Sequence, residues 1–265
     1  MLISFLAQRA RAAVKAALLH ILGSLFVAAL AAALVFLVWY PHPYGLVSGG
    51  LKLFLILVSV DVVCGPLLTL VLFNPRKPRR ELVTDMGLVV LIQLAALAYG
   101  LHTVHQARPL FLVHEVDRFR VITAGDYGDA DVREAIAGLD APLRPHPFKG
   151  PVTVGIRAPR NREESQKVLW ASLAGGRDYS QRPEFYIPYD VAYQGKALAR
   201  AKPLVRFIER YPGTTGEAAD LLRKRGVQTE DALFLPVLHR QEWIAVLDKS
   251  ANILGFLPGD GFAVP

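Results

Sequence analysis

The sequence predicts a membrane protein with three transmembrane helices followed by a soluble α+β domain that contains an antiparallel sheet. Three observations lead to this fold class. Hydrophobic residues make up 52% of the chain. They concentrate before about residue 106, in three runs that can each cross roughly 30 Å of hydrocarbon as a helix. The remainder has the strand and helix patterns of an ordinary soluble domain. We therefore expect a membrane domain over residues 1–105 and a globular domain over residues 106–265.

The first transmembrane helix is expected at about residues 17–40. Three basic residues precede it: Arg9, Arg11 and Lys15. A signal peptide begins in the same way, but this apolar run is too long for a signal-peptide core and ends in the interfacial aromatic pair Trp39-Tyr40. We interpret the run as a retained helix, with cleavage near Ala33 as the alternative.

The second and third transmembrane helices are expected at about residues 51–73 and 86–104. Pro66 falls inside the second span, where it cannot donate an N–H and clashes with the preceding turn. A kink is therefore expected near Asp61 and Val62. The third span carries Gln93 near its middle.

The flanking charges predict the orientation of these helices. The loop 41–50 has no Lys or Arg, whereas the loop 74–85 has four: Arg76, Lys77, Arg79 and Arg80. By the positive-inside rule, the N-terminus and the loop 74–85 lie in the cytoplasm. The loop 41–50 and the C-terminal domain then lie outside, which in the inner membrane of a Gram-negative cell is the periplasm.

Asp61 is the most informative single residue, because it lies in the middle of an apolar span. A carboxylate that faces lipid costs at least a few kcal/mol, so it must face protein, pair or stay protonated. Either a functional contact with a partner or a structural polar contact between helices explains it. With Pro66 and Gln93, Asp61 is our candidate for a partner-contact site.

The soluble domain has strand patterns at both ends and helical patterns between them. Asn161 followed by Glu164 has the spacing of a capping box, which opens a helix to about Ala174. Gly226 stops another helix. The expected strands are 110–116 and 119–124, which form a hairpin, then 152–156, 232–239, 242–248 and 252–257; the expected helices are 130–138, 161–174, 203–211 and 217–225. This order favours an α+β domain with one antiparallel sheet.

The sequence contains no signature of a catalytic, cofactor or metal site. It has no G-x-S-x-G, P-loop, G-x-G-x-x-G or H-E-x-x-H motif. His102 and His105 are three residues apart, but no other ligand is near in sequence, so we interpret them as interfacial histidines. Cys64 is the one cysteine, so no internal disulfide can form. The basic excess, +5 before residue 106 and +2 after it, flanks the membrane spans, and we expect contact with membrane lipid and no nucleic-acid binding.

Five segments together resemble a known family. They are WYPHPY (39–44), VDVVCGPLLTLVLFNPRKPRREL (60–82), IQLAALAYGLHTVHQARP (92–109), EVDRF (115–119) and LPGDGF (257–262). The chain is similar to the type IV pilin accessory proteins of the TfpX/TfpZ family. The resemblance covers nearly the whole chain and is strongest over residues 39–120.

The resemblance implies a non-enzymatic accessory factor of the inner membrane that helps its cognate major type IV pilin persist or assemble. Such a pilin has one apolar membrane helix with a charged N-terminal amine, and Asp61 could pair with that amine. Two alternatives belong to other classes: a membrane enzyme that modifies pilin, and a membrane-anchored periplasmic ligand-binding protein. Three spans joined by short loops fit neither as well.

Overall fold

The computed structural model describes residues 2–127, 130–146 and 148–265. Its chain forms two compact units. The helical unit contains residues up to 38 together with 50–106, and the C-terminal unit contains 39–49 together with 107–265. The segment 39–49, which joins the first two long helices, thus belongs to the C-terminal unit. We call this segment the connector.

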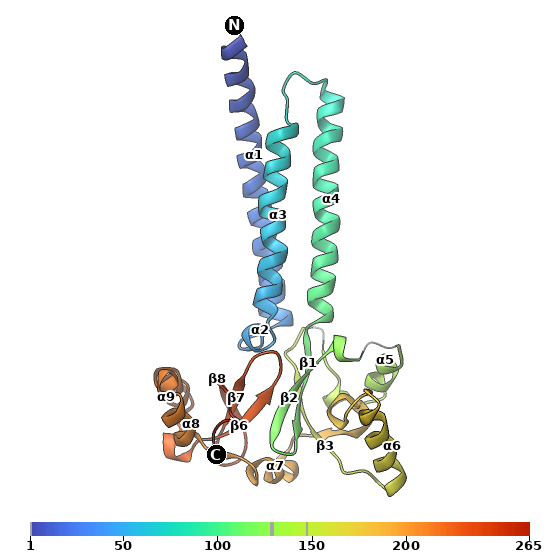
Figure 1. Ribbon diagram of the computed structural model, residues 1–265, viewed down its shortest axis with the longest axis vertical. Coiled ribbons are helices and arrows are strands. Elements are labelled where there is room, and N and C mark those ends of the chain that lie inside the picture. The colour runs from blue at the N-terminus through green and yellow to red at the C-terminus, as the bar shows by residue number, and fades with distance from the viewer. Residues whose placement is uncertain (1, 128–129, 147) are drawn as a thin grey trace. The chain divides into compact units, whose positions relative to one another are not determined.

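The helical unit consists of three long helices (Figure 1). They are α1 (Leu2–Ala33), which continues as the π-helical η1 (Leu34–Trp39), α3 (Gly50–Leu72) and α4 (Arg79–Gln106). All three are long and apolar enough to cross a membrane. The expectation of three transmembrane helices agrees with this. Helices α1 and α4 begin well before the apolar runs do, because helical structure continues into polar residues beyond the hydrophobic stretch.

The C-terminal unit is built on one eight-stranded sheet in the order β4-β3-β1-β2-β6-β7-β8, with β5 also paired to β6. The strands are β1 (Pro109–Glu115), β2 (Arg118–Thr123), β3 (Val152–Ile156), β4 (Tyr186–Pro188), β5 (Lys202–Pro203), β6 (Leu233–Leu238), β7 (Trp243–Leu247) and β8 (Ile253–Pro258). The expected hairpin is present as β1 and β2, whose pairing is antiparallel.

The expectation of a purely antiparallel sheet is wrong, because the sheet is mixed. Strand β1 pairs with β3 in parallel, and β2 pairs with β6 in parallel, while the remaining pairs are antiparallel. Parallel neighbours need a long crossover connection. The expected helices between β2 and β3 and between β3 and β6 belong to these crossovers, but the strand patterns alone did not reveal which strands they would bring together.

Six α-helices and six short 3₁₀ helices accompany the sheet in the part of the C-terminal unit that the structure describes. The α-helices are α2 (Tyr44–Val47), α5 (Ala130–Ala137), α6 (Arg162–Leu173), α7 (Val191–Leu198), α8 (Leu204–Arg210) and α9 (Thr215–Arg225); the 3₁₀ helices are η2 (Ala124–Asp126), η3 (Ala141–Leu143), η4 (Tyr179–Gln181), η5 (Pro183–Phe185), η6 (Pro212–Thr214) and η7 (Thr229–Asp231). Figure 1 shows α8 and α9 beside β8, and α5 and α6 beside β3.

The helix ends follow local sequence. Asn161 caps α6 by accepting a hydrogen bond of 2.8 Å from the backbone N–H of Glu164. Only this half of the expected capping box forms, because the Glu164 carboxylate binds Arg157 instead. Helix α9 ends at Gly226, whose φ of 68° places it in the left-handed region that favours glycine.

Both faces of the sheet are covered. Successive side chains of a strand point to opposite faces. Leu112 and Leu235 therefore lie in one core cluster, with Ala197 of α7, while Phe111 and Phe234 lie in the clusters on the other face, with residues of α5, α8 and α9. This two-sided burial explains why most strands are apolar along their whole length.

The connector supplies part of this core. Val47 is fully buried in the same cluster as Leu112 and Leu235. Tyr40 is also almost fully buried, and the ring of Tyr44 lies 5.6 Å from that of Phe256 on β8. A segment that the sequence suggests is only a short loop is therefore an integral part of the C-terminal unit.

Replacing Val47 with Asp should destabilise the C-terminal unit by at least about 3 kcal/mol, because a charge would be buried without a partner. Chemical denaturation of the purified full-length protein in detergent micelles measures this. Leu46→Asp is the matched control, since Leu46 is the adjacent residue and is 42% exposed; it should change the free energy of unfolding by about 0.5 kcal/mol or less. Equal effects of the two variants would contradict the packing of the connector.

Candidate functional site

Asp61 lies near the middle of α3 and is half-buried in the helical unit. Its side chain lines a cavity of about 300 Å³. Residues of all three long helices form the lining: His20, Gly23, Ser24, Val27 and Ala28 of α1, Val58 and Asp61 of α3, and Val90, Gln93, Leu94 and Leu97 of α4. The cavity therefore joins Asp61 and Gln93, two of the three residues that the sequence indicated as a partner-contact site.

Gln93 contacts the backbone of Asp61. Its amide Nε2 donates a hydrogen bond of 3.0 Å to the main-chain carbonyl oxygen of Asp61. The two candidate residues are thus in contact, but the Asp61 carboxylate takes no part in it. Within the described residues, neither the Asp61 carboxylate nor the buried Oε1 of Gln93 has a hydrogen-bond partner.

Gly65 and Pro66 lie one turn further along α3, and both are buried. A Cβ atom added at Gly65 would lie 2.2 Å from Nε2 of Gln93. Glycine is thus required here for Gln93 to cross α3 and reach the Asp61 carbonyl. Pro66 cannot donate to the carbonyl of Val62. Helix α3 nevertheless continues through Pro66, whose side chain can make no polar contact.

A second polar contact joins α1 to α3, and the sequence analysis did not anticipate it. Nδ1 of His20 lies 2.6 Å from Oγ1 of Thr69, which is buried. The signal was available, because His20 is a polar residue within an apolar span. Interhelical bonds of this kind are typical of packed transmembrane helices. They fix α1 and α4 to α3 at two different levels.

The C-terminal unit has a second cavity, of about 280 Å³, which the sequence analysis also missed. It lies at the carboxyl ends of the parallel strands β1 and β3, where open sheets commonly bind ligands. His114 and Tyr193 line it. His114 is 1% exposed, its Nδ1 lies 3.1 Å from the Tyr193 hydroxyl, and its Nε2 has no hydrogen-bond partner among the described residues.

The electrostatics of this second cavity keep its histidine neutral near pH 7. Burial lowers the pKa of His114 to about 4; the Asp117 carboxylate opposes this shift and Lys196 adds to it. The Tyr193 hydroxyl accepts a 3.0 Å hydrogen bond from the backbone N–H of Ile156. The sequence signal for this arrangement is a histidine that directly follows the apolar run 110–113.

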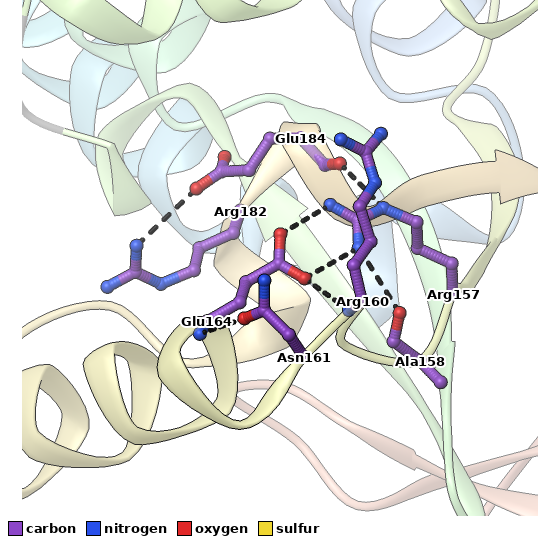
Figure 2. Close-up of polar contacts among 7 residues, drawn as sticks. All are labelled: Arg157, Ala158, Arg160, Asn161, Glu164, Arg182 and Glu184. Atoms are coloured by element: carbon purple, nitrogen blue, oxygen red, sulfur yellow. Dashed lines mark hydrogen bonds and ion pairs between the residues drawn. The ribbon is translucent and has the colours of Figure 1, made fainter.

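Arg157, which lines the second cavity, pairs with Glu164 (Figure 2). Arg157 binds the Glu164 carboxylate through two hydrogen bonds, of 2.8 and 3.0 Å. The backbone N–H of Arg160 donates another, of 2.6 Å, to the same carboxylate. These bonds, above all those from Arg157, hold the pKa of Glu164 down to about 2. The pair stays charged and holds the end of β3 against the start of α6.

Metal chemistry finds no support in the described part of the chain. No group of three His, Cys, Asp or Glu residues is close enough there to hold a metal ion. The polar groups in the helical unit, a carboxylate, an amide and a histidine, are suited to hydrogen bonding or to pairing with a charge.

Gly65→Ala should displace Gln93 from the Asp61 carbonyl and destabilise the helical unit by about 1 kcal/mol, the usual range for an interhelical hydrogen bond. Unfolding of the protein in mixed micelles by increasing SDS measures this. Gly87→Ala is the matched control on α4, because a Cβ there meets no atom within 4 Å. If both substitutions had the same effect, the close approach at Gly65 would not contribute to stability.

Comparison with known proteins identifies relatives over nearly the whole chain. The model of the family described as "Fimbrial assembly protein FimB" matches residues 8–49. The "Fimbrial assembly protein, serogroup I" of Dichelobacter nodosus is 36% identical over 258 residues, covering 96% of this chain and 98% of that protein. The serogroup E1 protein is 34% identical over the same length.

A shorter relative, the "Fimbrial assembly protein, serogroups C1 and C2" of the same organism, is 46% identical over 119 residues, or 45% of this chain and 91% of that protein. No solved structure matches the chain. Family membership rests on the similarity that extends over both units. The chain belongs to the fimbrial assembly protein family.

Proposed function

We propose that this protein is an inner-membrane accessory factor, a pilin-specific chaperone of the TfpX/TfpZ type, which stabilises a cognate type IV pilin or assists its assembly without being an enzyme. The observation that carries this proposal is the 36% identity over 258 residues to a protein named for fimbrial assembly. The similarity spans the three candidate membrane helices and the sheet domain alike. A role in fimbrial biogenesis therefore involves the whole protein.

The two-unit organisation suits such a role. A pilin that waits in the inner membrane has an apolar helix in the bilayer and a head outside it. The helical unit offers polar groups inside the membrane, and the C-terminal unit offers a folded surface outside it. One chain can thus protect both parts of the same subunit.

The connector supports the proposed topology by an argument independent of charge. Residues 39–49 share one core with residues 107–265, so both segments must lie on the same side of the membrane. Two crossings, by α3 and α4, bring the chain back to that side. The loop 74–85 lies on the opposite side, and its four basic residues favour the cytoplasm for that side. These observations support our proposal that the C-terminal unit lies in the periplasm.

Labelling of single cysteines tests this topology in the Cys64→Ser background. His42→Cys in the connector and Val191→Cys in the C-terminal unit are both at exposed positions, and both should react with a membrane-impermeant maleimide in intact spheroplasts. Pro75→Cys, between α3 and α4, should react only after lysis. Labelling of only one of the first two positions would contradict the shared compartment, and labelling of Pro75→Cys alone would reverse the orientation.

Deleting the gene should lower the stable pool of the cognate pilin and the number of surface pili, since an unprotected subunit is exposed to degradation. Immunoblotting and electron microscopy measure the two quantities, and expression from a plasmid should restore both. The intact mass of the remaining pilin should be unchanged. A missing covalent modification would replace the chaperone with a pilin-modifying enzyme, and an undiminished pool and normal piliation would refute both.

A further inference from the structure

The three long helices leave a groove along one side of α3. Helices α1 and α4 each pack extensively along α3, whereas no comparable contact joins α1 to α4 among the described residues. The cavity of about 300 Å³ lies between them, with walls from α1 and α4 and a floor that includes Val58 and Asp61 of α3. We call this the α1–α4 groove.

Three of the five residues on the α1 wall of the groove have small side chains. Gly23, Ser24 and Ala28 line it, and a Cβ atom added at Gly23 would meet no atom within 4 Å. Walls of this kind let another helix backbone approach closely, which is how transmembrane helices associate when no hydrophobic force drives them together. Most of the remaining lining is aliphatic, as the surface of an apolar helix requires.

The floor of the groove carries the carboxyl group of Asp61, and this chain offers no Lys or Arg at the same depth. The spans contain no Lys or Arg near their middle: residues 16–51, 53–75 and 81–107 have none. His20 is bonded to Thr69, which lies eight residues, or roughly 12 Å, further along α3 than Asp61. No ion pair joins His20 to Asp61 within the described residues. The amide nitrogen of Gln93 donates to the Asp61 backbone carbonyl, and its amide oxygen has no hydrogen-bond partner among the described residues.

We propose that the α1–α4 groove is the docking site for one apolar transmembrane helix of a partner, and that this helix brings a cationic group to Asp61. Lipid chains would fill the groove but leave the carboxylate unpaired, which is costly at this depth. A second copy of the chain brings no Lys or Arg at the middle of its spans. A partner helix with a cation satisfies both the shape and the charge. This inference rests on the proposed function only in naming the partner, the fimbrial subunit.

Photo-crosslinking from inside the groove tests the occupant. Benzoylphenylalanine at Val27 of α1 or at Leu94 of α4 faces the groove. Phe26 and Ile92 are the matched controls, because both are exposed. Successive residues of a helix are rotated by about 100° around its axis, so these two side chains face away from the groove. In membranes that also contain the co-expressed fimbrial subunit, the two groove positions should crosslink to that subunit's membrane helix, as identified by mass spectrometry, and the control positions should not. Crosslinks to lipid or to a second copy of this chain would overturn the proposal.

Filling the groove should prevent docking without disturbing the fold. Gly23→Leu adds a side chain where there is space, and it should lower the crosslinking yield from Leu94 by about fivefold or more, as the loss of ordinary helix–helix packing implies. Ala29→Leu is the matched control on the exposed side of α1. An undiminished yield in Gly23→Leu, at equal protein level, would mean that the subunit binds elsewhere.

Asp61→Asn tests the charge. Asn keeps the size and polarity of the side chain but cannot attract a cation, so the crosslinking yield should fall by a similar factor, about fivefold. An unchanged yield would overturn the charge pairing.

The gene deletion separates this inference from the proposed function. If the deletion lowers the pilin pool while the groove positions crosslink to lipid, the accessory function stands and the groove inference fails. If the groove captures the subunit but the deletion leaves the pilin pool and the pili unchanged, the docking site stands and the chaperone function fails.

Discussion

The burial of the connector in the sheet domain is the constraint on which the rest of this structure depends. Val47 is fully buried beside Leu112 and Leu235, although two long helices separate it from them along the chain. A core cannot form across a bilayer. The two helices must therefore cross the membrane as a pair, and the C-terminal unit completes its core only when both have done so. Folding of the sheet domain is in this way coupled to insertion of the helices.

Within the helical unit, α3 holds the other two helices through polar contacts at different levels. Thr69 binds His20 of α1, and the Asp61 carbonyl binds Gln93 of α4. Each contact is worth little by itself in a membrane. Their effect is to fix α1 and α4 on α3, while the cavity that Asp61 lines stays open between them.

In the C-terminal unit, too, some polar residues hold the fold together while others line a cavity. Arg157 and Glu164 satisfy each other's hydrogen-bonding groups and hold the end of β3 in place. Gly155 leaves room for the ring of Tyr193, since a Cβ there would lie 2.5 Å from it. His114 is then held beside a cavity with one nitrogen unpartnered. The pocket lies at the ends of two parallel strands, the usual location for ligand binding in open sheets.

The sequence by itself determined the features that depend on local pattern and length. Three apolar runs predicted the three long helices, the two strand-like segments that flank Asp117 and Arg118 predicted the β1–β2 hairpin, and Asn161 and Gly226 marked the ends of helices. It also indicated Asp61 and Gln93 as a candidate site, because a polar residue in an apolar span is visible without knowledge of the fold.

Only the tertiary structure decided which segments meet. Parallel pairing of β1 with β3 depends on the path of the intervening chain, so the strand patterns could not distinguish a mixed sheet from an antiparallel one. Val47 and His114 look like ordinary loop and strand residues, and their roles come from neighbours more than 60 positions away. The groove beside Asp61 exists because α1 and α4 both pack on α3 but make no comparable contact with each other among the described residues. That is a property of helix packing, which apolar composition alone does not specify.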